Sequence, residues 1–213
     1  MSESKPIRLV AFASGGGSNV RAIYHNIETG ALHAELVGVI SNNSQCGALV
    51  HARLHNIPAF HISRKQFDSD DDFVQKLFKV LTELKAELIV LAGYMKKMPE
   101  PVVRAYKNRM LNIHPALLPS FGGKGLYGHF VHEAVLNYGC KVSGVTVHLV
   151  DADFDTGAPV LQRCISVFDN DTPETLAARV LKEEHIIYSQ AIQLFAEERI
   201  LVDGRRVRIL EKE

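Results

Sequence analysis

An amide and an imidazole lie two residues apart in the apolar segment Leu-Asn-Ile-His-Pro, where they are Asn112 and His114. Side chains two apart on a β-strand point to the same face, so a strand over 110–113 lets both groups address one ligand atom. Pro115 lacks the N–H that a continuing ladder needs, so we expect the strand to end beside it. An amide donor next to an imidazole suits the polarisation of a carbonyl group and the movement of a proton.

The acidic segment Asp151–Gly157 follows an expected strand over 142–150 and contains three carboxylates. It resembles a calcium loop in part, but Thr156 stands where that loop needs glycine. Its Asp-Thr-Gly triplet also occurs in aspartic proteases, which need a second copy to form their pair of carboxylates. One of these carboxylates could orient the imidazole of His114, and a solvated acidic turn accounts for the same residues.

The glycine-rich segment Ser14–Asn19 follows an apolar run and precedes a helical pattern from Val20 to about Ile27. Free N–H groups and the helix dipole make such a helix start favourable for an anion. The segment therefore fits a phosphate site, and an ordinary tight turn fits it equally well. Val20 interrupts the dinucleotide motif GxGxxG, and the Gly-Gly-Lys124 triplet lacks the serine or threonine of a P-loop.

Short apolar runs alternate with helical patterns along the first half of the chain. We expect strands over 7–13, 36–40, 59–62, 88–92 and 110–113, and helices over 20–27, 47–54 and 70–85. Apolar strands between helices are typical of a parallel sheet that is covered on both faces. The predicted fold class is therefore α/β, with a mostly parallel, doubly wound sheet that binds ligands at the carboxyl ends of its strands.

The second half of the chain has a different pattern. We expect a short helix over 131–137 and strands over 142–150 and 160–167. Thr172 and Pro173 are typical of the cap and first position of a helix, which should extend to about residue 198. A hairpin over 200–207 should turn at Asp203-Gly204. With no repeat or linker, we expect a single domain over 1–213, with halves at about 1–110 and 111–213.

The composition narrows the class of function. The 213 residues include 24 basic and 24 acidic side chains, so no nucleic-acid partner is expected. We expect no membrane association, because no apolar run approaches the ~20 residues of a membrane span. The polar start of the chain favours a cytoplasmic location. Three scattered cysteines and the absence of a paired histidine motif argue against a metal site.

Several short motifs follow one another along the chain and together form a recognisable set. They are Gly-Gly-Gly-Ser-Asn at 15–19, Leu-Ala-Gly-Tyr-Met at 91–95, Asn-Ile-His-Pro-Ala-Leu-Leu-Pro at 112–119, Gly-Val-Thr-Val-His at 144–148, Asp-Phe-Asp-Thr-Gly-Ala-Pro at 153–159 and Glu-His-Ile-Ile-Tyr at 184–188. The set resembles the phosphoribosylglycinamide formyltransferases (glycinamide ribonucleotide transformylases) in their single-domain bacterial form. The resemblance implies a Rossmann-like formyltransferase fold. It also implies transfer of the formyl group of 10-formyltetrahydrofolate to the amine of glycinamide ribonucleotide in de novo purine (IMP) biosynthesis.

The resemblance also implies roles for particular residues. The catalytic residues would be Asn112, His114 and Asp155. The nucleotide would bind at Gly16, Gly17, Ser18, Asn19 and Glu184. The folate co-substrate would bind at Met95, Lys96, Lys97, Met98, Asn112, Val150, Asp151 and Asp155. Asn112 and a protonated His114 would donate to the oxyanion, and Asp155 would keep His114 cationic and relay a proton.

Other features remain open at the level of sequence. The family often has an arginine where this chain has Asp70, and Arg64 or Lys65 are candidates to replace it. An alternative activity is hydrolysis of 10-formyltetrahydrofolate by a deformylase, which needs no nucleotide site. A regulatory module that only binds nucleotides would leave Asn112, His114 and Asp155 without a purpose. We expect small-molecule substrates and a monomer or weak homodimer.

Overall fold

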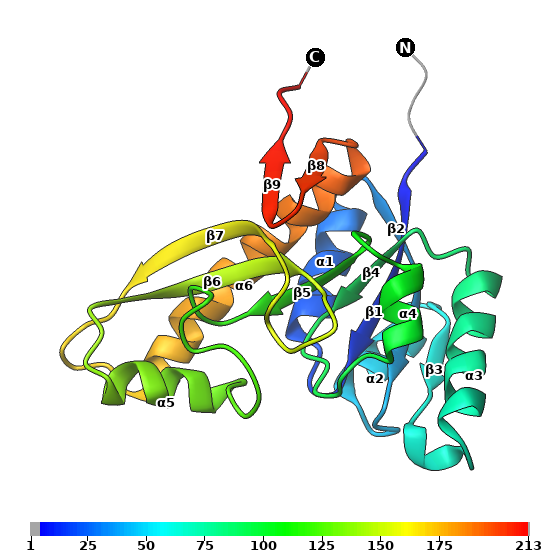
Figure 1. Cartoon of the computed structure of the whole chain (residues 1–213), viewed down its shortest axis with the longest axis horizontal. Coiled ribbons are helices and arrows are strands. Elements are labelled where there is room, and N and C mark those ends of the chain that lie inside the picture. Colours follow the sequence, from blue (N-terminus) through cyan, green and yellow to red (C-terminus); the bar gives the residue numbers. More distant parts are fainter. Residues whose placement is uncertain (1–4, 213) are drawn as a thin grey trace.

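A seven-stranded sheet forms the centre of the molecule in the computed structural model, which describes residues 5–212 (Figure 1). Its strand order is β3-β2-β1-β4-β5-β6-β7. The strands are β1 (Ile7–Ala13), β2 (Ala34–Ser41), β3 (Ala59–His61), β4 (Leu88–Leu91), β5 (Met110–His114), β6 (Val142–Leu149) and β7 (Pro159–Ser166). All neighbours from β3 to β5 pair in parallel, whereas β6 and β7 are antiparallel additions. The mostly parallel α/β sheet expected from the sequence is confirmed.

Helices cover both faces of this sheet (Figure 1). One face packs against α1 (Ser18–Glu28), α2 (Gly47–Leu54), α5 (His129–Asn137) and α6 (Pro173–Ala196). The other packs against α3 (Asp70–Glu83) and α4 (Glu100–Ala105), with the 3₁₀ turn η1 (Arg64–Gln66) before α3. Because side chains alternate along a strand, Leu9 and Ala11 enter the first core while Val10 and Phe12 enter the second.

Local signals place most helix ends where the sequence predicts them. The Thr172 hydroxyl accepts from the N–H of Thr175, so it caps α6 as expected. Ser69 caps α3 in the same way, by accepting from the N–H of Asp72. The sequence missed α4, because six residues are too few to show a helical period.

Helix α6 is tied to the middle of the sheet by a buried tyrosine. The hydroxyl of Tyr188 lies 3.1 Å from the carbonyl oxygen of Leu91 at the end of β4 and 3.2 Å from that of Leu111 in β5. Each bond joins the helix to a strand that precedes or contains predicted folate-binding residues, 95–98 after β4 and Asn112 in β5. Glu184, one helical turn before Tyr188, is thereby held at a fixed position relative to these strands.

The chain continues into a hairpin of β8 (Ile200–Asp203) and β9 (Arg206–Ile209), which forms a sheet of its own. Its two turn residues are Gly204 and Arg205, one position beyond the predicted Asp203-Gly204, because Asp203 still pairs with Arg206. Ile200, Val202 and Val207 pack partly buried against the main core. Within residues 5–212, no helix combines the length and apolar character needed to cross a membrane.

Candidate active site

The pairing of β5 with β6 forms a polar surface inside an otherwise apolar sheet. The antiparallel register sets Asn112 opposite His148 and His114 opposite Thr146. Leu111 and the other odd-numbered neighbours belong to the core beneath α6, so the four polar side chains project from the opposite face. The predicted shared face of Asn112 and His114 therefore exists, and β5 extends one residue further than expected, to His114.

Asp155 lies over this face and contacts both predicted catalytic partners. Its Oδ2 atom lies 3.5 Å from Nδ1 of His114, and its Oδ1 atom lies 3.4 Å from Nδ2 of Asn112. The N–H of Gly123 donates to Oδ2 at 2.9 Å, so the loop over 120–128 also reaches this carboxylate. The side chains of Asn112 and His114 and the N–H of Gly123 thus meet at a carboxyl group that is remote from all three in the sequence.

His148 is the member of this cluster that sequence reasoning missed. Its Nδ1–H donates to the carbonyl oxygen of Leu149 at 2.7 Å, so Nε2 is free to accept from Nδ2 of Asn112 at 3.1 Å. Nε2 also lies 3.5 Å from Oδ1 of Asp155. The signal was present in the Gly-Val-Thr-Val-His motif, but only the strand register shows that His148 faces Asn112.

The protonation states of Asp155 and His114 follow from their burial and their neighbours, and that of His114 differs from the expectation. Burial raises the pKa of the Asp155 carboxyl, but the contact with the His148 imidazole, the nearby His114 imidazole and the N–H of Gly123 together hold it below its ordinary 3.8. Burial lowers the pKa of His114 below 6.5, although Asp155 and the carbonyl oxygen of Phe121 oppose this. The cationic His114 expected from the resemblance is therefore disfavoured here, because its imidazole is buried. Its Nε2–H donates instead to the Phe121 oxygen at 2.8 Å.

A small cavity adjoins Asn112 and Asp155. Seven of the eight predicted folate residues line it, together with Tyr94 and His148; they are Lys96, Lys97, Met98, Asn112, Val150, Asp151 and Asp155. The eighth, Met95, is not among the lining residues: its side chain is exposed and its N–H donates to Oγ of Ser14 at 2.9 Å. The cavity measures about 50 Å³, and an ion pair of 3.3 Å joins Lys97 to Asp153 beside it.

The glycine loop leads into α1 as expected. Gly17 has φ = 76°, and a Cβ atom there would lie 2.7 Å from Cα of Ala48, so this position requires glycine. Helix α1 begins at Ser18, which leaves its first N–H groups at the loop. Arg21, another residue that sequence reasoning missed, donates from its guanidinium to the carbonyl oxygen of Gly16.

Asn19 links the glycine loop to α6. Its Nδ2 donates to Oε2 of Glu184 at 2.7 Å, while its buried Oδ1 has no hydrogen-bond partner. Burial raises the pKa of the Glu184 carboxyl above its ordinary 4.5, and the Asn19 N–H opposes this effect. The pair leaves one amide oxygen and one carboxyl group, both acceptors, side by side.

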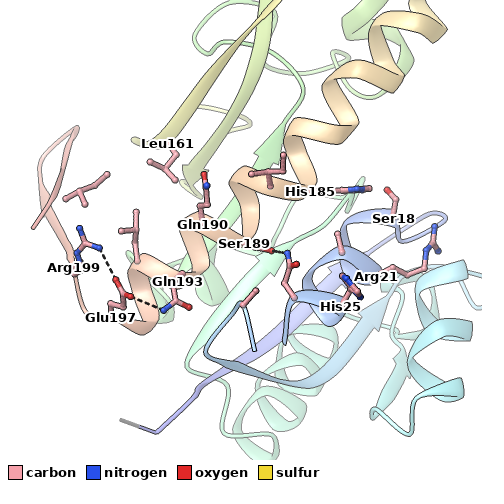
Figure 2. A pocket seen from close by; sticks show the side chains of 16 residues that line it. Ser18, Arg21, His25, Leu161, His185, Ser189, Gln190, Gln193, Glu197 and Arg199 are labelled. Carbon is pink, nitrogen blue, oxygen red and sulfur yellow. Dashed lines mark hydrogen bonds and ion pairs between the residues drawn. The ribbon is translucent and has the colours of Figure 1, made fainter. Parts of the chain in front are cut away.

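A much larger groove of about 950 Å³ opens between α1 and α6 (Figure 2). Ser18, Arg21 and His185 lie at one end of it, and the ion pair of Glu197 with Arg199 lies at the other. None of the three predicted catalytic residues lines the groove. The size of a cavity is therefore a poor guide to the chemistry of this protein.

Two other expectations concern charge. Arg64 forms an ion pair with Asp70 and donates to the carbonyl oxygen of Phe67 at 2.7 Å, so the candidate replacement cation does lie at the Asp70 position. Among residues 5–212, no three or more histidine, cysteine or acidic side chains are grouped as a metal site.

Comparison with known proteins adds to this geometry. A model described as formyl transferase matches residues 7–192. The chloroplastic phosphoribosylglycinamide formyltransferase of Arabidopsis thaliana is 43% identical over 199 residues, which are 93% of this chain and 68% of that protein. The protein of the same name from Bacillus subtilis is 34% identical over 186 residues, which are 87% of this chain and 93% of that protein. The chain spans 62% to 68% of the length of three such plant proteins.

Solved structures agree with these matches. Glycinamide ribonucleotide transformylase 1 from Symbiobacterium toebii has a TM-score of 0.91 at 39% identity, covering 98% of this chain and 96% of its own. A formyltetrahydrofolate deformylase from Pseudomonas syringae has a TM-score of 0.88 at 23% identity, and the match covers 98% of this chain and 67% of that one, a likeness that shows the fold alone. The chain therefore belongs to the formyl transferase family of enzymes.

Proposed function

We propose that the protein transfers the formyl group of 10-formyltetrahydrofolate to the amine of glycinamide ribonucleotide in de novo purine (IMP) biosynthesis. The names of its relatives, phosphoribosylglycinamide formyltransferase and glycinamide ribonucleotide transformylase, support the formyl transfer and its acceptor. The observation that carries this proposal is the bond between Asn19 and Glu184, which joins the start of α1 at the glycine loop to α6 and sets two acceptors side by side. A hydrolase of formyl folates needs no such site, whereas an enzyme that accepts a nucleotide needs both a phosphate site and an orienting acceptor.

The nucleotide phosphate is assigned to the loop of Gly16, Gly17 and Ser18. The N–H groups at the start of α1 favour an anion, and the guanidinium of Arg21 adds a cation beside them. The unpartnered oxygen of Asn19 and the carboxyl group of Glu184 then accept N–H or O–H donors of the same substrate.

The co-substrate is assigned to the cavity beside Asn112. Ligand pockets usually measure about 300–1,000 Å³, so the loop over 150–158 must move outward to admit a folate. The ion pair of Lys97 with Asp153 is exposed and of low energetic cost to open. Lys96 and Lys97 then face the incoming molecule, whose glutamate carboxylates suit such cations.

The reaction needs no covalent enzyme intermediate. The lone pair of the substrate amine forms a bond to the formyl carbon, and the carbonyl electrons move to oxygen. Asn112 donates to this oxyanion, so its long contact with Asp155 is given up. The Nε2–H of His114 also donates to the oxyanion once it leaves the carbonyl oxygen of Phe121. Asp155 takes a proton from the attacking nitrogen through water and returns it to the departing folate nitrogen as the bond from carbon breaks.

A direct assay tests the function. Purified protein with 10-formyl-5,8-dideazafolate should show the absorbance change of deformylated product only when glycinamide ribonucleotide is also present. Formate should not accumulate in either condition. Formate release at the same rate without the nucleotide would show that the protein is a deformylase and not a transferase. No absorbance change in either condition, for folded protein, would reject both enzymes.

Other properties stay predictions. We propose a cytoplasmic location and a monomer or weak homodimer, and we assign no metal to the reaction. The single domain over 1–213, with a nucleotide half and a folate half, also stays a prediction; in support, one continuous sheet contains strands of both halves.

The buried carboxyl group of Glu184 gives a prediction on stability. Its pKa is raised in the folded protein, so its contribution to stability is fully present below pH ~4.5 and is lost as pH rises through the folded pKa. Glu184→Gln should therefore raise the melting temperature at pH 7.5, by about 2–4 °C for each kcal/mol gained, and should make little difference near pH 4. The KM for the nucleotide should rise at the same time, because an amide attracts the substrate amine less.

Glu183→Gln is the matched control for this change. Glu183 pairs with Arg163 at 2.6 Å on the neighbouring position of α6, so its substitution should bring no gain in stability and no change in nucleotide KM. Thermal unfolding at both pH values and steady-state kinetics measure the difference. A Glu184→Gln protein that melts lower than wild type at pH 7.5 would show that the charged carboxylate is a net stabiliser.

A further inference from the structure

The turn of the β8–β9 hairpin reaches the loop that carries Asp155. Nη1 of Arg205 donates to the carbonyl oxygen of Thr156 at 3.0 Å. Thr156 directly follows Asp155, so this bond acts on the backbone one residue from the carboxylate that joins Asn112 and His114. The family match ends at residue 192, so the contact comes from a segment beyond it.

The base of the hairpin is firmly attached to the end of α6. The N–H of Leu210 donates to the carbonyl oxygen of Arg199 there at 2.9 Å, and Nε of Arg199 donates to the Leu210 carbonyl oxygen at 2.7 Å. Nη1 of Arg199 pairs with Glu197 at 2.9 Å. Because the base is held and the inner side chains pack on the core, the position of the turn is set by α6.

The loop itself needs an external support. Asp155 has φ = 56°, a left-handed conformation that a residue with a side chain adopts at a cost of roughly 1–3 kcal/mol. Gly157 is seated so closely that a Cβ atom would lie 1.7 Å from the carbonyl oxygen of Leu149. Thr156, between a strained residue and an immobile one, is exposed, and its carbonyl oxygen is the group that Arg205 holds.

A cavity of about 470 Å³ separates the hairpin from the loop. Val202 and Gly204 line it on the hairpin side, and Ala152 and Gly157 line it on the loop side. Gly204 and Gly157 adjoin Arg205 and Thr156 in the chain, so the bond between Arg205 and Thr156 links the hairpin to the loop beside this cavity. The inner side carries the exposed ion pair of Lys97 with Asp153, which must open for the co-substrate.

We infer that Arg205 is a positioning residue for formyl transfer, which keeps Asp155 in place through the Thr156 carbonyl group while the Asp153 side of the loop opens. This inference rests on the proposed function. A hydrogen bond from a guanidinium fixes the peptide without blocking the cavity side by which the co-substrate enters. The hairpin thus contributes to the reaction although none of its residues touches a substrate.

Arg205→Ala tests the inference, with Arg206→Ala as the matched control on the next residue and Arg205→Lys as the conservative variant. Arg205→Ala should lower kcat about fivefold, equivalent to about 1 kcal/mol, and raise the KM for the folate. The KM for the nucleotide and the melting temperature should stay at the wild-type values. Arg205→Lys should recover most of the loss, because an ammonium group can also donate to the carbonyl oxygen.

Hydrogen exchange of the substrate-free proteins tests whether Arg205 holds the loop, separately from whether this support matters for the reaction. Amides of residues 151–157 should exchange faster in Arg205→Ala than in wild type or Arg206→Ala, while those of β5 should not change. Unchanged exchange in this loop overturns the inference, and so does faster exchange with wild-type kinetics. Wild-type protein that transfers no formyl group is a different result, since it rejects the proposed function itself.

Discussion

Asp155→Asn should lower the turnover number by about 10²–10³-fold, although the two side chains have almost the same shape. All four groups around the carboxylate present nitrogen atoms: the N–H of Gly123, the amide of Asn112 and the imidazoles of His114 and His148. An asparagine offers one oxygen and one NH₂ group, so its NH₂ group faces another donor in either orientation, the N–H of Gly123 at the Oδ2 position or the amide of Asn112 at the Oδ1 position. It also loses the base that accepts the proton of the attacking amine.

Asp153→Asn is the control for this substitution, because Asp153 lies on the same loop but is exposed and pairs with Lys97. Steady-state kinetics should show a large fall in kcat for Asp155→Asn and at most a moderate change in the folate KM for Asp153→Asn. Nucleotide affinity, measured by calorimetry, should be the same in both proteins. Near-normal turnover by Asp155→Asn would remove this carboxylate from the mechanism.

Asn112→Ala should reduce kcat and kcat/KM together by about 10²–10³-fold, or near 3–4 kcal/mol, the usual loss for one oxyanion donor. Nδ2 of Asn112 donates to His148 at 3.1 Å and to Asp155 at 3.4 Å. The second contact is long, so its hydrogen is the one available to the oxyanion. An alanine supplies neither hydrogen and leaves the ground-state contacts of both substrates largely intact.

Asn137→Ala provides the matched control, since Asn137 is exposed at the end of α5. Single-turnover kinetics on both variants would isolate the chemical step from binding. The decisive comparison is between kcat and the folate KM of Asn112→Ala. A rise in the folate KM at unchanged kcat would show that Asn112 binds folate and that other groups donate to the oxyanion.

Patterns within one segment of the chain predicted the fold well. The glycine loop before α1 and the Thr172 cap of α6 each depend on a few consecutive residues, and both lie where expected. The terminal hairpin also forms, but it turns at Gly204-Arg205, one residue beyond the expected position. Helix α4 was missed because its six residues show no period. Elements with a clear local pattern could therefore be predicted from one sequence, and an element too short to show such a pattern could not.

The candidate site was harder to predict, because it depends on contacts between distant segments. His148 was missed although it lies in a recognised motif, since its partner Asn112 is defined by the register of β5 with β6. Burial lowers the pKa of His114 and disfavours its cationic form in the free protein, an effect that neighbouring residues in the sequence do not reveal. The roles of Arg21 and Asn19 needed the direction of their side chains, which no spacing supplies.

The change from parallel to antiparallel pairing at β5 has a consequence for how such an enzyme can diversify. Two adjoining strands present their functional groups directly across from each other, so the length of each strand is fixed by chemistry as well as by packing. Adding or deleting one residue between Gly144 and Leu149 would exchange every polar group there for an aliphatic one. In related enzymes, insertions and deletions should accordingly accumulate in the loops, while the number of residues in β5 and β6 stays the same.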